Sequence, residues 1–352
     1  MDRRTFGKKL TTAAITTSLP FLGLSHTEHS MESECSRKLI KPKRLKPGDT
    51  IGLVTPAGPI TEEQLKKTIT NIEGLGFNVE FNERRVLARN GYLAGSDLAR
   101  ADEVNLMFAN PDIDGIWCIR GGYGVARMLD MLNYKVIRQN PKVLIGYSDI
   151  TALHQAIYKK TGLVCFHGPV GASTFTDYTT KHVKNIITNP QENYTIEYAG
   201  ENADKEDDVY RSYVIKEGIA EGTLIGGNLT LAASLVGTPY DVSYDDKLVF
   251  LEDIGEKPYR IDRMLTQMLL AGKFNKVKGV ILGVFYNCEA KEGDNSLSLD
   301  DMLIDRFNCL NVPIIYGMSF GHIDNQFTLP LGIYARLNTA DKTITLLESS
   351  VI

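Results

Sequence analysis

The sequence predicts an α/β protein in which an N-terminal domain with a parallel sheet is followed by a C-terminal mixed α/β domain. Short apolar segments alternate with helical segments over the first half, strand-like segments dominate the second half, and a polar stretch separates the two. Such alternation is typical of a parallel sheet covered by helices on both faces. A length of 352 residues is ample for two domains.

The first half of the chain contains strand-like segments separated by helical ones. Residues 50–55 form the first predicted strand, and Ser96 is the expected N-cap of a helix that runs to about residue 108. These elements belong to a predicted N-terminal domain over residues 41–190. The other segments expected in it are helices over 61–75 and 149–160 and strands over 78–81, 115–119, 142–145 and 163–166.

The second half is richer in strands and belongs to a predicted C-terminal domain over residues 216–352. Its clearest helix, over residues 259–271, places apolar side chains on one stripe and is followed by Gly272, which suits a C-terminal cap. The polar residues 191–215 are predicted to link the two domains. The predicted strands cover residues 219–225, 247–251, 279–282, 312–316, 332–337 and 343–347.

Residues 1–40 differ from the rest and are predicted to form an export leader and a linker. A cationic start precedes residues 10–24, which carry no charge and are short for a membrane span of about 20 strongly apolar residues. Residues 3–8, RRTFGK, resemble the twin-arginine export signal of bacteria. We therefore expect export to the periplasm, with no stable membrane insertion after leader removal. The alternatives are a disordered basic tail and a cytoplasmic location.

The bulk composition is that of an ordinary globular protein and excludes several classes of function. The net charge is -4 and no cationic residues cluster on a predicted face, which argues against nucleic acid as a partner. The five cysteines include no Cys-x-x-Cys pair, so neither a redox motif nor a disulfide framework is indicated. The histidines are scattered without a His-Glu-x-x-His pair. We expect neither a metal nor a cofactor.

One serine lies at a position that suits a nucleophile. Ser148 follows a predicted strand and precedes a predicted helix, and ligands of parallel α/β sheets gather at the carboxyl ends of the strands. A sharp turn of this kind can hold a hydroxyl beside amide groups that stabilise an oxyanion. Ile150 replaces the second glycine of the Gly-x-Ser-x-Gly elbow, which disfavours an ordinary α/β-hydrolase. The alternative is that Ser148 only caps the helix.

A serine nucleophile needs a base and an orienting acid. His167 and His322 are the candidate bases because each ends a strand-like stretch, whereas the other histidines fall in the leader or on predicted helices. Glu252 ends a predicted strand and is the candidate acid. Taken singly, each histidine is more often structural or solvated, and Glu252 with Asp253 more often forms a solvated acidic pair.

Two glycine-rich segments also follow predicted strands. The first, residues 120–124 (RGGYG), lacks the spacing of a dinucleotide or phosphate loop. Its adjacent glycines can supply bare N–H donors and Arg120 can pair with a carboxylate, whereas a simple glycine turn is the alternative. In the second, residues 222–228 (GTLIGGN), close backbone packing is expected first and a site contact of Asn228 second.

Taken together, several segments resemble the L,D-carboxypeptidase family of serine peptidases, also called muramoyltetrapeptide carboxypeptidases. The matches occur in order from about residue 46 to the end of the chain, which is far more specific than any one of them. The leader lies outside the resemblance, and relatives that recycle murein fragments generally work in the cytoplasm. The matching segments are IRGGYG (119–124), GYSDIT (146–151), HGP (167–169), GGNL (226–229), LEDI (251–254) and FGH (320–322).

The resemblance implies a two-domain enzyme with its active site between the domains. Ser148 would be the nucleophile, His322 the general base and then acid, and Glu252 the residue that orients the imidazole. The amide of Asp149 and one from the turn formed by Gly121 and Gly122 would make the oxyanion hole. The implied reaction releases the terminal D-alanine of a murein tetrapeptide. Arg120 is the candidate for binding the substrate carboxylate, and a homodimer is plausible from the resemblance.

Two other functions stay open at this point. The microcin C immunity peptidases share the resemblance and cleave a peptide-nucleotide amide, which calls for an aromatic surface facing the nucleobase. Trp117, the sole tryptophan, lies in a predicted core strand, and this disfavours such a surface. The second alternative is a non-catalytic muropeptide-binding protein. The sequence argues against it, because residues for all three chemical roles are present.

Overall fold

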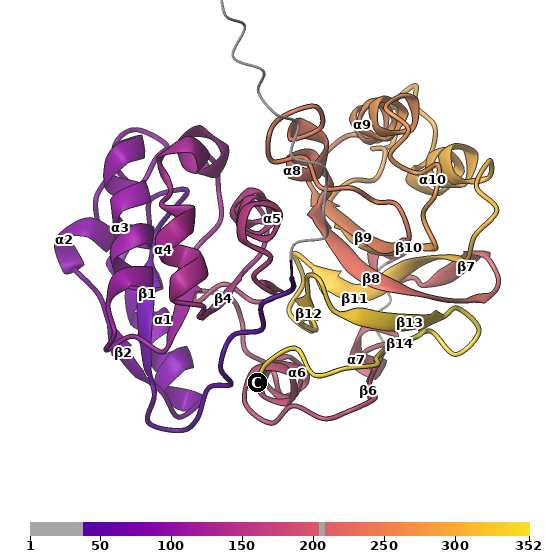
Figure 1. The fold of residues 1–352 in the computed structure, drawn as a ribbon. Coiled ribbons are helices and arrows are strands. Elements are labelled where there is room, and N and C mark those ends of the chain that lie inside the picture. Colours follow the sequence, from indigo (N-terminus) through magenta and orange to yellow (C-terminus); the bar gives the residue numbers. More distant parts are fainter. Residues whose placement is uncertain (1–37, 204–207) are drawn as a thin grey trace, which may run out of the picture. The chain divides into compact units, whose positions relative to one another are not determined.

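A six-stranded sheet carries the N-terminal half of the chain in the computed structural model, which describes residues 38–203 and 208–352 (Figure 1). Its strands are β1 (Thr50–Val54), β2 (Asn78–Glu80), β3 (Gly115–Cys118), β4 (Val143–Gly146), β5 (Phe166–His167) and β12 (Leu329–Pro330). They lie in the order β12-β5-β4-β3-β1-β2. The pairs among β1 to β5 are parallel, as predicted, whereas β12 comes from the C-terminal part and pairs antiparallel with β5.

Helices cover both faces of this sheet, as a parallel arrangement requires. On one face, α1 (Glu62–Gly74) and α6 (Asp177–Ile187) bury apolar side chains in the same cluster as Trp117 of β3. On the other face, α3 (Asp97–Ala109) and α5 (Ile150–Thr161) share a cluster with alternate residues of the same strands. Both faces are therefore apolar, which explains why the strands show no alternation of polar and apolar residues.

The longer helices agree with the sequence prediction, whereas several short ones were not expected. Ser96 caps α3 as predicted, because its Oγ accepts the N–H of Ala99 at 3.2 Å. The unexpected elements are too short to show a helical period. They are α2 (Glu83–Val86), η1 (Val125–Met131) and α4 (Tyr134–Gln139).

An eight-stranded sheet of mixed direction carries the C-terminal half, as predicted. Its strands are β6 (Tyr194–Glu197), β7 (Tyr213–Lys216), β8 (Ile219–Asn228), β9 (Lys247–Ile254), β10 (Gly279–Tyr286), β11 (Ile314–Gly321), β13 (Tyr334–Asn338) and β14 (Thr343–Leu346). They lie in the order β6-β14-β13-β8-β9-β10-β11-β7, in which β8 to β11 are parallel and the flanking pairs antiparallel.

Three helices connect the parallel strands of this larger sheet. They are α8 (Leu229–Ser234), α9 (Pro258–Leu270) and α10 (Leu299–Phe307). Figure 1 shows them together on one side of the sheet, and α9 contacts both α8 and α10. This arrangement places the carboxyl ends of β8, β9, β10 and β11 along one edge, from which a site can be built.

The segment predicted to link the domains, residues 191–215, also contributes to the larger sheet. β6 pairs with β14, and β7 pairs with β11. Between these strands the structure describes α7 (Gly200–Ala203) and η2 (Asp208–Tyr210). β6 alternates buried and exposed residues, so only one of its faces is apolar. At four residues each, these edge strands are too short to stand out within a polar segment when only the sequence is read.

All described residues belong to one compact unit. A single apolar cluster runs through both sheets, and it includes Leu53 and Ile145 of the smaller sheet and Leu248 and Ile281 of the larger one. The division into two domains therefore stays a prediction. Within residues 38–203 and 208–352, no helix has the length and apolarity that crossing a bilayer requires.

The close packing of β8 against β9 yields a stability prediction. Gly226 has φ +150°, and a Cβ there would lie 1.8 Å from the carbonyl oxygen of Phe250. Gly226→Ala is therefore expected to lower the free energy of unfolding by about 3 kcal/mol or more, because backbone cannot move aside as a side chain can. Urea unfolding followed by circular dichroism measures the change.

The matched control for this prediction is Gly74→Ala at the end of α1. Its added Cβ meets no atom within 4 Å, so the free energy of unfolding should stay unchanged or rise slightly. Equal stabilities for the two variants would contradict the close contact between Gly226 and Phe250.

Candidate functional site

Ser148 lies in the turn between β4 and α5 and has a left-handed backbone conformation with φ 65°. This conformation costs a serine about 1–2 kcal/mol, and such strain is concentrated at functional positions. The alternative role as a helix cap is not observed, because the N-cap of α5 is Asp149 and no side chain caps this helix. The Ser148 hydroxyl is partly exposed and has no hydrogen-bond partner among the described residues.

Gly121 packs directly against Ser148 because it has no side chain. A Cβ on Gly121 would lie 2.8 Å from the Cβ of Ser148 and 3.1 Å from its Oγ. The carbonyl of Gly121 accepts the N–H of Gly58 at 3.1 Å, which fixes this loop. In the described part of the chain, the amides of Gly121, Gly122 and Asp149 donate to no protein acceptor. These predicted oxyanion donors therefore lie beside Ser148 with their hydrogens free.

Glu252 and His322 form a hydrogen bond of 2.8 Å between Oε2 and Nδ1. Glu252 lies in β9 and is fully buried, whereas His322 follows the end of β11 and is partly exposed. The imidazole packs edge-on against Tyr147, with 4.7 Å between the ring centroids. Because Tyr147 precedes Ser148 in the chain, the acid and imidazole lie beside the turn that carries the hydroxyl.

Ser148 and His322 are both described by the structure, and they form no hydrogen bond with each other. Catalytic hydrogen bonds of ligand-free enzymes are often long and tighten when substrate binds, so this geometry does not exclude the pair. The structure thus brings Glu252 and His322 into contact and packs the imidazole against Tyr147, the residue before Ser148.

The Glu252–His322 contact shifts the pKa of each partner toward its charged form. Burial raises the pKa of Glu252, but the nearby His322 outweighs burial and leaves that pKa below its usual range. Burial lowers the pKa of His322, and the Glu252 carboxylate more than offsets this, so the pKa lies above its ordinary value. When Nδ1 donates to the carboxylate, Nε2 of the neutral ring is left as an acceptor. That is the tautomer a general base needs.

Hydrogen bonds join α5 to the strands that carry the acid. Thr151 Oγ1 accepts the N–H of Asn228 at 2.9 Å, and Asn228 lies opposite Glu252 in the β8–β9 register. The Asn228 side chain donates to Asp253 Oδ1 at 3.1 Å and accepts the N–H of Leu231, which caps α8. Asn228 is therefore a buried residue with internal partners, and a contact between it and a ligand stays a prediction.

The other predicted site residues differ in accessibility. Arg120 is exposed, and one of its terminal nitrogens donates to the carbonyl of Pro59 at 2.7 Å. His167 is buried in β5 against Phe250, and burial lowers its pKa to about 4. A ring so hard to protonate is a poor choice for the base. In the described ranges, no cluster of three or more His, Cys, Asp or Glu residues could hold a metal.

Sequence reasoning missed the aromatic side chains of this region. Tyr147 packs between His322 and His167, with ring centroids 4.7 and 6.1 Å away. Tyr92 and Tyr123 are both exposed and pack edge-on at 5.6 Å. Tyr123 and Tyr147 each lie inside a glycine-containing segment that resembles the family, residues 119–124 and 146–151. Their position in these segments is the signal that could have identified them. Only the fold brings Tyr92 next to Tyr123.

Two profiles of known protein families match the chain. The LD-carboxypeptidase N-terminal domain matches residues 51–168, and the LD-carboxypeptidase C-terminal domain matches residues 221–337. The first match contains Ser148, and the second contains Glu252 and His322.

The individual relatives are named either as murein peptide carboxypeptidases or as microcin C7 self-immunity proteins. The probable murein peptide carboxypeptidase of Bacillus subtilis (strain 168) is 36% identical over 308 residues, which is 86% of this chain and 93% of the relative. The structure of the muramoyltetrapeptide carboxypeptidase from Oxalobacter formigenes has a TM-score of 0.71 at 29% identity and covers 84% of this chain and 97% of its own. The structure of the microcin C7 self-immunity protein MccF in complex with aspartyl sulfamoyl adenosine has a TM-score of 0.78 at 27% identity. The match covers 89% of this chain and 100% of the MccF chain.

The hydrogen bond between the buried Glu252 and His322 yields a prediction about charge. Glu252→Gln removes the carboxylate that favours the imidazolium, so the pKa of His322 should fall below its value in the unaltered protein. NMR titration of the His322 ring measures this pKa directly. Glu221→Gln, which removes a carboxylate paired with Arg336 on an exposed part of the molecule, is the control and should leave it unchanged. An unaltered pKa in Glu252→Gln would contradict the pairing.

Proposed function

We propose that this chain, which belongs to the LD-carboxypeptidase family of serine-type peptidases, releases the terminal D-alanine from murein tetrapeptides. The observation that carries this proposal is the hydrogen bond between the buried Glu252 and the partly exposed His322, beside the turn that holds Ser148. The names of two relatives, a murein peptide carboxypeptidase and a muramoyltetrapeptide carboxypeptidase, support the substrate.

The proposed mechanism assigns one role to each of three side chains. Ser148 Oγ attacks the carbonyl carbon of the scissile amide while His322 Nε2 takes its proton. Glu252 holds the ring through Nδ1 and stabilises the imidazolium that forms. His322 then gives the proton to the leaving amine, D-alanine departs, and an acyl-enzyme remains on Ser148. Water, deprotonated by His322, hydrolyses this ester and restores the serine.

Backbone amides are proposed to stabilise the negative charge that develops on the carbonyl oxygen. The candidates are the N–H of Asp149 and one N–H from the turn formed by Gly121 and Gly122. Their hydrogens are free in the described part of the chain, and Gly121 lies against Ser148. Removal of one such donor typically costs about 10²–10³-fold in rate. The left-handed conformation of Ser148 holds the hydroxyl next to these donors.

The substrate ends in a free carboxylate, and Arg120 is proposed to bind it. Its side chain is exposed, and its contact with Pro59 uses one nitrogen and leaves others available. A guanidinium can bind a carboxylate through two parallel hydrogen bonds. Asn228 is a weaker candidate for a substrate contact, because its side chain already has internal partners.

The compartment and assembly are further parts of the proposal. The twin-arginine-like segment over residues 3–8 lies outside the described residues, and we propose that it addresses the chain to the periplasm. In that compartment the natural substrate would be the peptide of the cell wall, whereas a cytoplasmic enzyme would act on recycled fragments. A homodimer is also proposed, on the family resemblance alone.

A second candidate function has one specific observation in its favour. The structure of MccF with aspartyl sulfamoyl adenosine is similar to this chain, which suggests cleavage of a peptide-nucleotide amide. Trp117 is fully buried and donates to the Pro169 carbonyl, so it offers no surface for a base. The exposed pair Tyr92 and Tyr123 does offer an aromatic surface, next to the glycine segment.

The nucleophile assignment predicts the behaviour of Ser148→Ala. D-Alanine release from murein tetrapeptide, measured by mass spectrometry, should fall by up to about 10⁶-fold while tetrapeptide binding persists. Ser234→Ala changes an exposed serine on α8 and should keep normal turnover. If Ser148→Ala kept full activity, the triad proposal would fail. If the unaltered protein and Ser148→Ala both bound the tetrapeptide and neither released D-alanine, a non-catalytic muropeptide-binding protein would be indicated.

A comparison of substrates separates the two candidate functions. We expect a higher kcat/KM for murein tetrapeptide than for an aminoacyl sulfamoyl adenosine, measured on the same preparation. Tyr123→Ala should then change the tetrapeptide rate little. The reverse order of kcat/KM, with a loss of nucleotide cleavage in Tyr123→Ala, would select the second function.

A further inference from the structure

The glycine-rich segment over residues 120–124 carries proposed oxyanion donors but belongs to no helix or strand. Gly122 and Gly124 have φ +119° and +120°, a conformation that glycine adopts readily. Glycine also leaves the chain free to adopt many other conformations, so the composition of this segment does not fix the direction of its amides. Contacts from other parts of the fold must therefore hold it.

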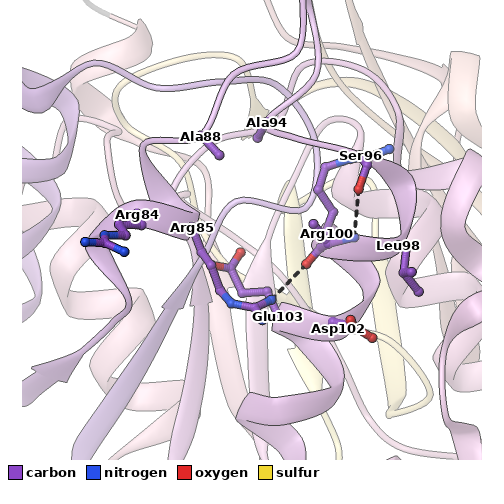
Figure 2. Close-up of a pocket in the computed structure, with 10 residues that line it drawn as sticks. Arg84, Arg85, Ala88, Ala94, Ser96, Leu98, Arg100, Asp102 and Glu103 are labelled. Atoms are coloured by element: carbon purple, nitrogen blue, oxygen red, sulfur yellow. Dashed lines mark hydrogen bonds between the residues drawn. The ribbon is translucent and has the colours of Figure 1, made fainter.

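One peptide group at the end of this segment is held at both of its polar atoms. The carbonyl of Gly124 accepts a hydrogen bond from Nη1 of Arg100 at 2.9 Å. The N–H of Val125, which belongs to the same peptide group, donates to Oδ2 of Asp149 at 2.8 Å. Arg100 reaches the peptide group from α3, where Figure 2 shows it among residues that line a neighbouring pocket. A rotation of this peptide group would break both hydrogen bonds at once.

The same two side chains connect this peptide group to other parts of the site. Asp149 belongs to the turn that holds the proposed nucleophile, and its own amide is a proposed oxyanion donor. Nη1 of Arg100 also donates to the carbonyl of Pro56, in the loop after β1. The same loop donates the N–H of Gly58 to the carbonyl of Gly121 at 3.1 Å. The nucleophile turn, the glycine-rich segment and the loop after β1 are therefore joined by one set of hydrogen bonds.

Burial restricts what Arg100 and Asp149 can do. Arg100 is 1% exposed and Asp149 is 2% exposed, so neither side chain is accessible to a substrate. A buried charge is costly unless it is paired, and Arg100 also forms an ion pair with Asp97 of the same helix. Hydrogen bonds to charged groups are stronger than those between neutral groups. The two side chains are thus suited to fixing backbone rather than to binding a ligand.

We propose that Arg100 and Asp149 are positioning residues for the oxyanion donors of the proposed hydrolysis, on which this inference rests. By orienting the peptide group between Gly124 and Val125, they keep the amides of the glycine-rich segment fixed relative to the amide in the nucleophile turn. The alternative is that they only stabilise the fold, since Asp149 also lies at the start of η1. The two roles predict different effects on the chemical step.

Asp149→Ala separates the two roles in the kinetics of D-alanine release. Oxyanion donors act on charge that develops only in the transition state, so their misplacement lowers kcat and leaves KM nearly unchanged. We expect kcat to fall about 10-fold or more, against about 10²–10³-fold for the complete loss of one donor. Asp149→Asn keeps a side-chain oxygen for the N–H of Val125 and should recover most of this loss. Measurement at pH 8 keeps the carboxyl of the unaltered protein ionised, because burial raises its pKa only to about 6.

The matched control is Asp114→Ala, at the opposite edge of the same sheet. Asp114 precedes β3 and its Oδ2 accepts the N–H of Thr50 at 2.9 Å, so this variant also loses a bond between a carboxylate and a backbone amide. Its kcat should equal that of the unaltered protein. Arg100→Lys keeps the charge but lacks the planar fork of the guanidinium, and it should lower kcat as Asp149→Ala does. It supplies the kinetic test if Asp149→Ala fails to fold.

NMR of the substrate-free protein tests the positioning without any reaction. In Asp149→Ala the amide signals of Gly121 and Gly122 should shift, and the amide of Val125 should exchange its hydrogen about 10-fold faster or more, because its acceptor is gone. Asp149→Asn and Asp114→Ala should stay close to the unaltered protein in both measurements. A protein that released no D-alanine would contradict the proposed function, and these amides would still decide the positioning.

Three results would overturn the inference. The first is an unaltered kcat in Asp149→Ala or in Arg100→Lys. The second is a loss of kcat in Asp114→Ala or Asp149→Asn as large as in Asp149→Ala, which would assign the loss to the fold or to the charge alone. The third is that the signals of Gly121 and Gly122 stay in place in Asp149→Ala.

Discussion

The buried carboxylate of Glu252 is the constraint on which the site depends. A fully buried ion is costly unless a partner neutralises it, and here the partner is the His322 ring at 2.8 Å. The strand that carries Glu252 and the one that precedes His322 lie on either side of β10, so the central strands must keep their register for the pair to form. The apolar core that runs through both sheets supplies that rigidity. Packing thus determines the electrostatics of the site.

Ser148 depends on a different kind of support. Its left-handed backbone is unfavourable by itself, and neighbours that leave no alternative maintain it. Gly121 packs against it on one side, and the buried Asp149 carboxylate next to it accepts the N–H of Val125 at 2.8 Å. Burial raises the pKa of Asp149 to about 6, so this contact includes a group that titrates near neutrality. The strain at the hydroxyl is therefore balanced by fixed backbone contacts around it.

Much of the fold could be predicted because its signals are local. The alternation of strands and helices, the Ser96 cap and the mixed direction of the second sheet follow from periodicity and composition. β6 and β7 were not predicted, since each is only four residues long and lies in a stretch that is polar overall. β12 was not predicted for another reason, because its two residues come from the C-terminal part and complete a sheet of the N-terminal part. No local pattern encodes a pairing over that distance.

The sequence by itself determined which residue types stand at the ends of strands, and hence the candidates Ser148, His322 and Glu252. The family resemblance favours His322 over His167 as the proposed base, and only the tertiary structure supplies a physical reason, because both histidines end strands and differ in burial and partners. His167 is enclosed by aromatic rings, whereas His322 meets a carboxylate and keeps partial exposure. Hydrogen-bond partners and desolvation are properties of three-dimensional packing. A chain read one residue at a time contains neither.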